Sequence, residues 1–215
     1  MTQINIQESV HKRNEDLAQV LNQKLTKDGV YCVNVMGAPG VGKTSVLTKL
    51  IPLLALKAAV IEGDIESDID TAKLNKLGIT AHQINTHGAC HLDSPLIKDA
   101  AEALSLHDSF LFIENIGNLV CPAEFMIGEH IKLLITSITE GSDKPYKYPL
   151  AFEKADVILI NKVDLKPYVE FDEEFFMKGV RALNPHVNVF PVCSRTGEGF
   201  NEVASWLNKR VHTGR

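Results

Sequence analysis

The sequence contains few cysteines, a single tryptophan and no long hydrophobic run. Its 215 residues include 4 cysteines and 1 tryptophan, which is not the composition of a small disulfide-stabilised protein. No stretch approaches the roughly 18 consecutive apolar residues of a membrane helix. The segment from Met1 to Asp28 is polar and mixed in charge, unlike a secretory signal. We therefore expect a cytoplasmic protein whose cysteines act, if at all, through metal or redox chemistry.

The sequence also lacks an excess of basic residues. Lysine and arginine number 22 against 27 aspartates and glutamates, which gives a formal net charge of -5. A basic patch for nucleic acid or for an anionic membrane is therefore not expected. Hydrophobic residues make up 45% of the chain, enough for the core of one α/β domain.

Apolar, β-branched runs alternate along the chain with segments of helical periodicity. Strands are expected at residues 30–36, 58–61, 80–84, 110–114, 131–138, 157–160 and 187–192, and helices at 3–27, 44–56, 69–77, 96–106, 171–183 and 200–211. This alternation predicts a mainly parallel, twisted sheet with helices on both faces, and ligands at the carboxyl ends of its strands. Residues 1–28 are interpreted as an N-terminal helical segment and 29–215 as one domain.

The first expected strand runs directly into a glycine-rich phosphate-binding pattern, G-x-x-x-x-G-K-[ST]. Its glycines let backbone N–H groups turn toward phosphate oxygens, and the helix that follows adds its positive end. The lysine brings a positive charge to the β and γ phosphates, and the threonine hydroxyl is a magnesium ligand. The P-loop residues are Gly37, Ala38, Pro39, Gly40, Val41, Gly42, Lys43, Thr44 and Ser45.

The N-K-x-D sequence at Asn161, Lys162 and Asp164 follows another buried strand. An aspartate there accepts hydrogen bonds from N1–H and the exocyclic amine of guanine. Adenine offers no such donor pair, so the site predicts a preference for guanine. A later segment with Ser194 and Arg195 is a candidate backbone contact to the base, although a simple Thr-Gly turn explains it equally well.

Two acidic residues end buried strands and are candidates for the magnesium site. Together with Thr44, the carboxylates of Asp64 and Glu114 are expected around the cation or its water. Gly117 follows in E-N-I-G, at the spacing of the D-x-x-G loop of small GTPases, and its N–H is a candidate γ-phosphate sensor. We assign Lys43, Asp64 and Glu114 to catalysis, and no catalytic base can be named from spacing.

A third set of residues has the chemistry of a soft-metal site. Cys90 and His91 are adjacent, and Cys121 follows the candidate γ-phosphate sensor. Thiolate and imidazole suit zinc or nickel rather than magnesium. Three ligands leave a four-coordinate site incomplete, and a second copy of the chain would complete it across a two-fold axis.

Composition alone also allows a plainer interpretation of these residues. Cysteine is often a small buried hydrophobe, and histidine is often a surface residue. Cys32, in an expected strand, and Cys193 fit that buried role better than a ligand role. His87 is a weak additional ligand candidate.

Taken together, these segments resemble the HypB family of GTPases, which incorporate nickel into nickel–iron hydrogenases. The resemblance extends over residues 33–206 and is most specific in its two cysteine-containing segments. It rests on G-A-P-G-V-G-K-T, V-I-E-G-D, G-A-C-H-L-D, E-N-I-G-N-L-V-C-P-A, D-K-P-Y-K-Y-P, N-K-V-D and T-G-E-G.

The resemblance implies a GTPase that dimerises when GTP is bound, with Cys90, His91 and Cys121 forming a nickel or zinc site at the dimer interface. It implies the accessory protein HypA and the hydrogenase large subunit as partners. The N-terminus lacks the C-x-x-C-type site and histidine-rich tract of some relatives, so nickel storage there is not expected. Lys144 and Lys147 match the family but receive no role.

Since Cys121 lies shortly after Gly117, we hypothesise that GTP hydrolysis changes the geometry of the metal site and releases nickel. Three alternatives remain open. A urease-type accessory GTPase would carry a Cys-Pro-His metal sequence, and a GTPase chaperone for a cobalamin enzyme would need no thiolate site. A zinc-stapled structural dimer would hydrolyse no GTP.

Overall fold

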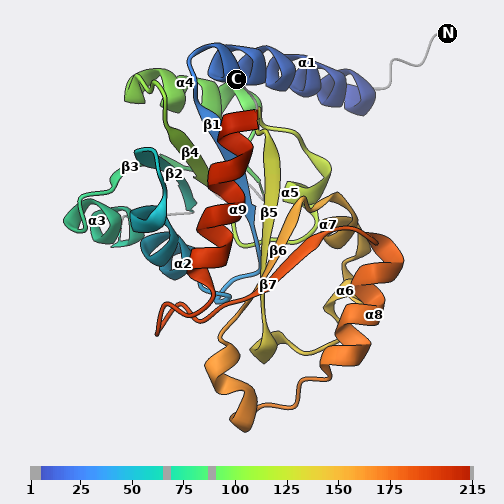
Figure 1. Cartoon of the computed structure of the whole chain (residues 1–215). Coiled ribbons are helices and arrows are strands. Elements are labelled where there is room, and N and C mark those ends of the chain that lie inside the picture. Colours follow the sequence, from blue (N-terminus) through green and yellow to red (C-terminus); the bar gives the residue numbers. More distant parts are fainter. Residues whose placement is uncertain (1–5, 65–68, 87–90, 214–215) are drawn as a thin grey trace, which may run out of the picture.

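The computed structural model describes residues 6–64, 69–86 and 91–213, and its described strands form one parallel sheet (Figure 1). The strand order is β3-β2-β4-β1-β5-β6-β7. Every strand expected from the sequence is present, which confirms the fold class. The bounds are β1 Tyr31–Met36, β2 Ala58–Asp64, β3 Thr80–Asn85, β4 Phe110–Glu114, β5 Ile131–Ser137, β6 Val157–Asn161 and β7 Asn188–Pro191.

Buried β-branched and aromatic side chains on both faces explain why the central strands form. Every residue of β4 and of β6 is buried, as expected for parallel strands with helices on both sides. One face packs against α2 (Lys43–Leu50), α3 (Ile69–Lys76) and α9 (Phe200–Thr213). In Figure 1, α9 crosses this face in front of the sheet.

The opposite face carries two further groups of helices. The half near β2 and β4 packs against α1 (Ile6–Lys27) and α4 (Ser94–Leu104), which Figure 1 shows side by side at one end of the molecule. The half near β5 and β6 packs against α5 (Cys121–Glu124), α7 (Pro149–Lys154) and α8 (Glu173–Leu183). Leu21 and Leu25 of α1 belong to the first of these cores. The division of the chain at residue 28 into a helical segment and a GTPase domain stays a prediction.

One predicted helix is clearly shorter in the structure, and three short helices were not predicted. The helix expected at 44–56 ends at Leu50, and a 3-10 turn (Ile51–Leu53) containing Pro52 follows, since proline lacks the N–H that an α-helix interior needs. The short helices α5, α6 (Lys144–Lys147) and α7 were missed because each is too short for a helical period to show. Among the described helices, none combines the length and apolar character needed to cross a membrane.

Candidate functional site

The P-loop connects the end of β1 to the start of α2, as the sequence predicts. Gly40 and Gly42 have φ angles of 78° and 94°, a left-handed region that other residues rarely adopt. A Cβ at position 42 would also lie 2.8 Å from Nδ2 of Asn161. Lys43 lies across the loop, with Nζ 3.4 Å from the carbonyl oxygen of Gly37. The glycines thus allow a conformation in which backbone N–H groups can surround a phosphate.

The amide of Asn161 joins three parts of the nucleotide site. Its Nδ2 donates to the carbonyl oxygen of Val41 (2.8 Å), and its Oδ1 accepts from the N–H of Ser194 (3.0 Å). The next residue, Lys162, donates from Nζ to the carbonyl oxygen of Gly40 (2.6 Å). Asn161 is fully buried, so losing either partner would leave a buried polar group unsatisfied. The N-K-x-D segment therefore fixes the P-loop as well as presenting Asp164.

Two side chains from the segment after β7 hold the carboxylate of Asp164. The Cys193 thiol donates to Oδ1 (3.1 Å), and Arg195 Nε donates to Oδ2 (2.9 Å). The hydrogen bond from Cys193, followed by that from Arg195, lowers the pKa of Asp164. Both favour the ionised form that can accept from guanine. Cys193 is buried, as predicted, but its contact with Asp164 was missed because nothing in the spacing pairs positions 29 residues apart.

Glu114 at the end of β4 reaches the first residues of α2. Its Oε1 accepts from the Thr44 hydroxyl (2.9 Å), so the structure brings together two predicted magnesium ligands. Its Oε2 is buried and has no hydrogen-bond partner among the described residues. Burial raises the pKa of Glu114 to about 7, although nearby Lys43 and the bond from Thr44 lower it. A buried carboxylate oxygen of this kind is a fitting ligand for a hard cation.

A second buried carboxylate, not predicted, lies beside Glu114. Glu62 of β2 is in register with Glu114 on the neighbouring strand, and its charge contributes to the raised pKa of Glu114. Thr71 of α3 donates a hydrogen bond to Glu62. The sequence shows this acid two positions before Asp64, but only the strand register places it next to Glu114. The predicted residue Asp64 ends β2, and its side chain lies outside the described part.

The segment that follows Glu114 passes directly along the P-loop. Asn118 forms an antiparallel bridge with Gly37. At Gly117 a Cβ would lie 2.9 Å from the Pro39 ring, so the backbone approaches the loop as closely as only glycine permits. Three residues after Asn118, Cys121 begins α5. The predicted γ-phosphate sensor and a predicted soft-metal ligand thus belong to one short segment in contact with the P-loop.

The soft-metal ligands are only partly within the described residues. Cys121 is partly exposed, and the His91 ring stacks on Phe125 just after α5, with centroids 4.0 Å apart. Cys90 and the weaker candidate His87 lie outside the described residues. Within the described part, no group of three or more metal-binding side chains is assembled. The three-ligand site therefore stays a prediction, although α5 brings the neighbourhoods of His91 and Cys121 together.

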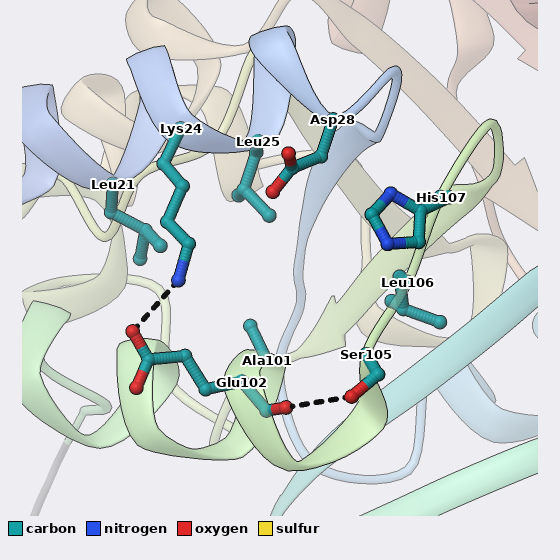
Figure 2. A pocket seen from close by; sticks show the side chains of 9 residues that line it. All are labelled: Leu21, Lys24, Leu25, Asp28, Ala101, Glu102, Ser105, Leu106 and His107. Atoms are coloured by element: carbon teal, nitrogen blue, oxygen red, sulfur yellow. Dashed lines mark hydrogen bonds and ion pairs between the residues drawn. The ribbon is translucent and has the colours of Figure 1, made fainter.

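Lys144 and Lys147, which match the family sequence, each form an ion pair with a nearby acidic residue. Lys144 pairs with Glu140 (3.2 Å), and Lys147 pairs with Asp143. A pocket of about 210 Å³ lies between α1 and α4 (Figure 2). There Lys24 points to Glu102 and forms an exposed ion pair of 2.8 Å with it. The pocket lies near the starts of β1 and β4, whereas the P-loop and Glu114 lie at their carboxyl ends.

Comparison with known proteins identifies similar sequences and structures. The family model described as "CobW/HypB/UreG, nucleotide-binding domain" matches residues 31–191. The hydrogenase maturation factor HypB of Azotobacter vinelandii is 41% identical over 213 residues, covering 98% of this chain and 70% of the relative.

Two solved structures are similar over nearly their whole length. HypB from Helicobacter pylori in complex with nickel has a TM-score of 0.88 and 33% identity, with 94% of this chain and 96% of that chain covered. The hydrogenase maturation factor HypB from Archaeoglobus fulgidus has a TM-score of 0.86 and 35% identity, with coverages of 93% and 99%.

Proposed function

Since this chain belongs to the HypB family of hydrogenase maturation factors and is a nickel-related GTPase of that family, we propose that GTP turnover controls its nickel site. GTP is the substrate and nickel is the cargo. The state of the nucleotide sets the geometry of Cys90, His91 and Cys121, and hydrolysis favours transfer of nickel toward the large subunit of a nickel–iron hydrogenase. The accessory protein HypA is the proposed partner, and the cytoplasm is the proposed location.

In this proposal each part of the nucleotide site has a defined role. The backbone from Gly37 to Ser45 surrounds the phosphates, and Lys43 neutralises charge that develops on the γ phosphate. Asp164 accepts from the guanine base, with its charge favoured by Cys193 and Arg195. Lys162 holds the P-loop by donating a hydrogen bond to the carbonyl oxygen of Gly40.

We place Mg²⁺ at Thr44 and Glu114, with Asp64 acting directly or through water. The unpartnered, buried Oε2 of Glu114 supports this placement, since a buried carboxylate requires a compensating partner. When bound, Mg²⁺ neutralises negative charge on the β and γ phosphates. Glu62, buried on the neighbouring strand, adds negative potential at the same place.

We expect Glu114 to make both stability and magnesium binding dependent on pH. Its pKa is about 7 in the folded protein against an ordinary value of 4.5, so the folded state binds more protons than the unfolded state between these values. The free energy of unfolding contributed by Glu114 therefore falls as pH rises through this window, by on the order of 3 kcal/mol at most. Relative to wild type, Glu114→Gln should gain stability above pH 7 in denaturant titrations without nucleotide.

The same variant should bind Mg²⁺–GDP more weakly, and wild type should release a proton on Mg²⁺ binding near pH 6. Calorimetry in buffers of different ionisation enthalpy measures that proton. Glu15→Gln, an exposed substitution in the middle of α1, is the matched control and should leave both properties unchanged. A flat pH profile for the difference between wild type and Glu114→Gln would contradict the assignment.

Nickel and zinc are the proposed occupants of the thiolate–imidazole set. Two copies of the chain would supply Cys90, His91 and Cys121 twice and complete the coordination, so we propose a homodimer favoured by GTP. The observation that carries this proposal is the path of the segment from Glu114 to Cys121. Glu114 accepts a hydrogen bond from Thr44, and Asn118 forms a bridge with Gly37 of the P-loop before the segment reaches Cys121. A γ phosphate that moves this segment also moves a sulfur ligand.

The direct test is nickel and zinc titration of the GDP and GTP-analogue forms, with the oligomeric state followed in the same samples. Unequal metal affinities in the two forms are expected, because a ligand shifts an equilibrium only through its differential affinity. Equal affinities would refute nucleotide control. Absence of binding would refute the metal site itself.

Cys121→Ala should weaken nickel binding by about a hundredfold or more, since even the loss of outer-shell partners costs 10- to 100-fold. Cys32→Ala is the matched control because Cys32 is fully buried within β1. It should lower the unfolding temperature without a comparable loss of nickel affinity. Equal losses in both variants would point to global destabilisation instead of lost coordination.

A further inference from the structure

A chain of three buried polar side chains and one partly buried lysine crosses the sheet face that is covered by α1, α4 and α5. Asn115, just after β4, donates from Nδ2 to Oδ1 of Asn34 in β1 (3.2 Å). Asn34 donates from Nδ2 to Oε1 of Glu129 (3.4 Å). The same oxygen of Glu129 lies 3.3 Å from Nζ of Lys132 in β5. We call these four residues the relay.

One end of the relay is next to Glu114 in the chain and contacts the first soft-metal segment, residues 90–92. Asn115 follows Glu114, which is bonded to Thr44. Its Oδ1 accepts from the N–H of Leu92 at 3.3 Å and of Ile116 at 2.9 Å. Leu92 is fully buried and follows His91. A displacement of Glu114 would therefore move Asn115, the next residue, and through it the backbone of Leu92 beside the predicted metal ligand His91.

The other end of the relay contacts the second soft-metal segment. The Lys132 ammonium donates to the carbonyl oxygens of Pro122 (3.2 Å), Ala123 (3.1 Å) and Phe125 (2.8 Å). These carbonyls belong to α5 and the residue after it, and Cys121 is the first residue of α5. Phe125 also stacks on the ring of His91. Lys132 thus fixes the backbone that carries Cys121 and the aromatic ring that contacts His91.

The relay is unusual for the interior of a parallel sheet. Asn34 lies between Cys32 and Met36 on one face of β1, and it is fully buried, where an apolar side chain would need no partners. It is in register with Lys132 on β5, so the strand pairing itself brings the two polar residues together. A buried network of this kind is stable only when its members are satisfied together, so a shift of one member disturbs the hydrogen bonds of the next.

From these contacts we propose that the relay couples the nucleotide site to both soft-metal segments, with Asn115 and Lys132 as positioning residues for the metal ligands. The inference rests on the proposed function, since it explains how the nucleotide state reaches His91 and Cys121 at once. The segment from Gly117 to Cys121 alone reaches only one of them. Through Asn115 the other ligand segment responds to the same change at Glu114.

The structure also contains a matched control for a purely structural role. Asn14 of α1 donates to the carbonyl oxygen of Met126 (2.8 Å) and accepts from the N–H of Ser94 (3.0 Å). It therefore ties together the same two segments, near Phe125 and near His91. Within the described residues, the hydrogen bonds of Asn14 lead to Met126 and Ser94 and not to Glu114 or the P-loop. Removing Asn14 weakens the support of the segments without cutting the relay.

The test compares nickel affinity in the GDP and GTP-analogue forms of the full chain. The first variant is the double substitution Glu129→Gln/Lys132→Met, which removes the ammonium without leaving an unpaired buried charge. The second is Asn34→Val, which cuts the relay in the middle of β1. Asn14→Ala is the control, and the unfolding temperature of each variant is measured in parallel.

We expect the wild-type ratio of nickel dissociation constants between the two forms to be roughly fivefold or more. Both relay variants should bring that ratio to within about twofold of one. Asn14→Ala should keep the wild-type ratio even where both affinities fall. If a folded relay variant keeps the wild-type ratio, or if Asn14→Ala loses it as well, the relay is only structural. A wild-type ratio of one would overturn nucleotide control itself, and the relay proposal with it.

Discussion

Asp164→Asn is expected to lower the affinity for GDP by on the order of a thousandfold while leaving the fold intact. The carboxylate oxygens of Asp164 face guanine N1–H and the exocyclic amine in the proposed binding mode, and the asparagine amide would turn a donor toward one of them. A site built to hydrogen-bond a substrate loses about this much when a buried polar group is left unmatched. Fluorescent-nucleotide titration measures the change directly.

Xanthine nucleotides provide the internal check on this result. Xanthine carries a carbonyl where guanine has its exocyclic amine, so the amide donor of the variant meets an acceptor again. The variant should therefore prefer XDP to GDP, reversing the wild-type order. Asp99→Asn, an exposed change on α4, should leave GDP affinity unchanged. If Asp164→Asn binds GDP as tightly as wild type, then Asp164 does not recognise the base.

Lys43→Ala is expected to slow GTP hydrolysis by at least about a hundredfold. The proposed role of its ammonium is to stabilise charge on the transferring phosphoryl group, and removing one such preorganised donor costs about 10²- to 10³-fold. Its position supports the role, because Nζ lies across the P-loop near the carbonyl oxygen of Gly37. Phosphate release under saturating GTP is the measurement.

Lys49→Ala provides the control for Lys43→Ala. Lys49 lies on the same helix, in its last turn, and is exposed. Its removal changes the net charge equally and should leave the hydrolysis rate within about twofold of wild type, as is usual for exposed positions. A Lys43→Ala rate equal to wild type would instead favour the alternative of a zinc-stapled structural dimer in which the nucleotide site is inactive.

The P-loop, the N-K-x-D segment and the order of strands and helices were predictable from the sequence. Each depends on neighbours in the chain: glycine spacing, an apolar run, or a charged residue at a strand end. Glu114 was predicted for the same reason, since it directly follows the buried run of β4. The helix expected at 44–56 was predicted too long because it ends before Pro52. The four-residue helix that begins at Cys121 was not predicted, because so short a helix shows no periodic signal.

Three arrangements were revealed only by the tertiary structure. Cys193 donates a hydrogen bond to Asp164, and Glu62 pairs in register with Glu114. Asn34 is hydrogen-bonded to both Asn115 and Glu129. These pairs are distant in sequence, and strand register or loop packing decides which side chains meet. Local spacing therefore determined which chemical groups this chain carries and at which strand ends. The tertiary structure determined which of them touch. A hydrogen bond needs its two atoms within about 3 Å, and the pairing of parallel strands brings residues that are distant in the sequence to that separation.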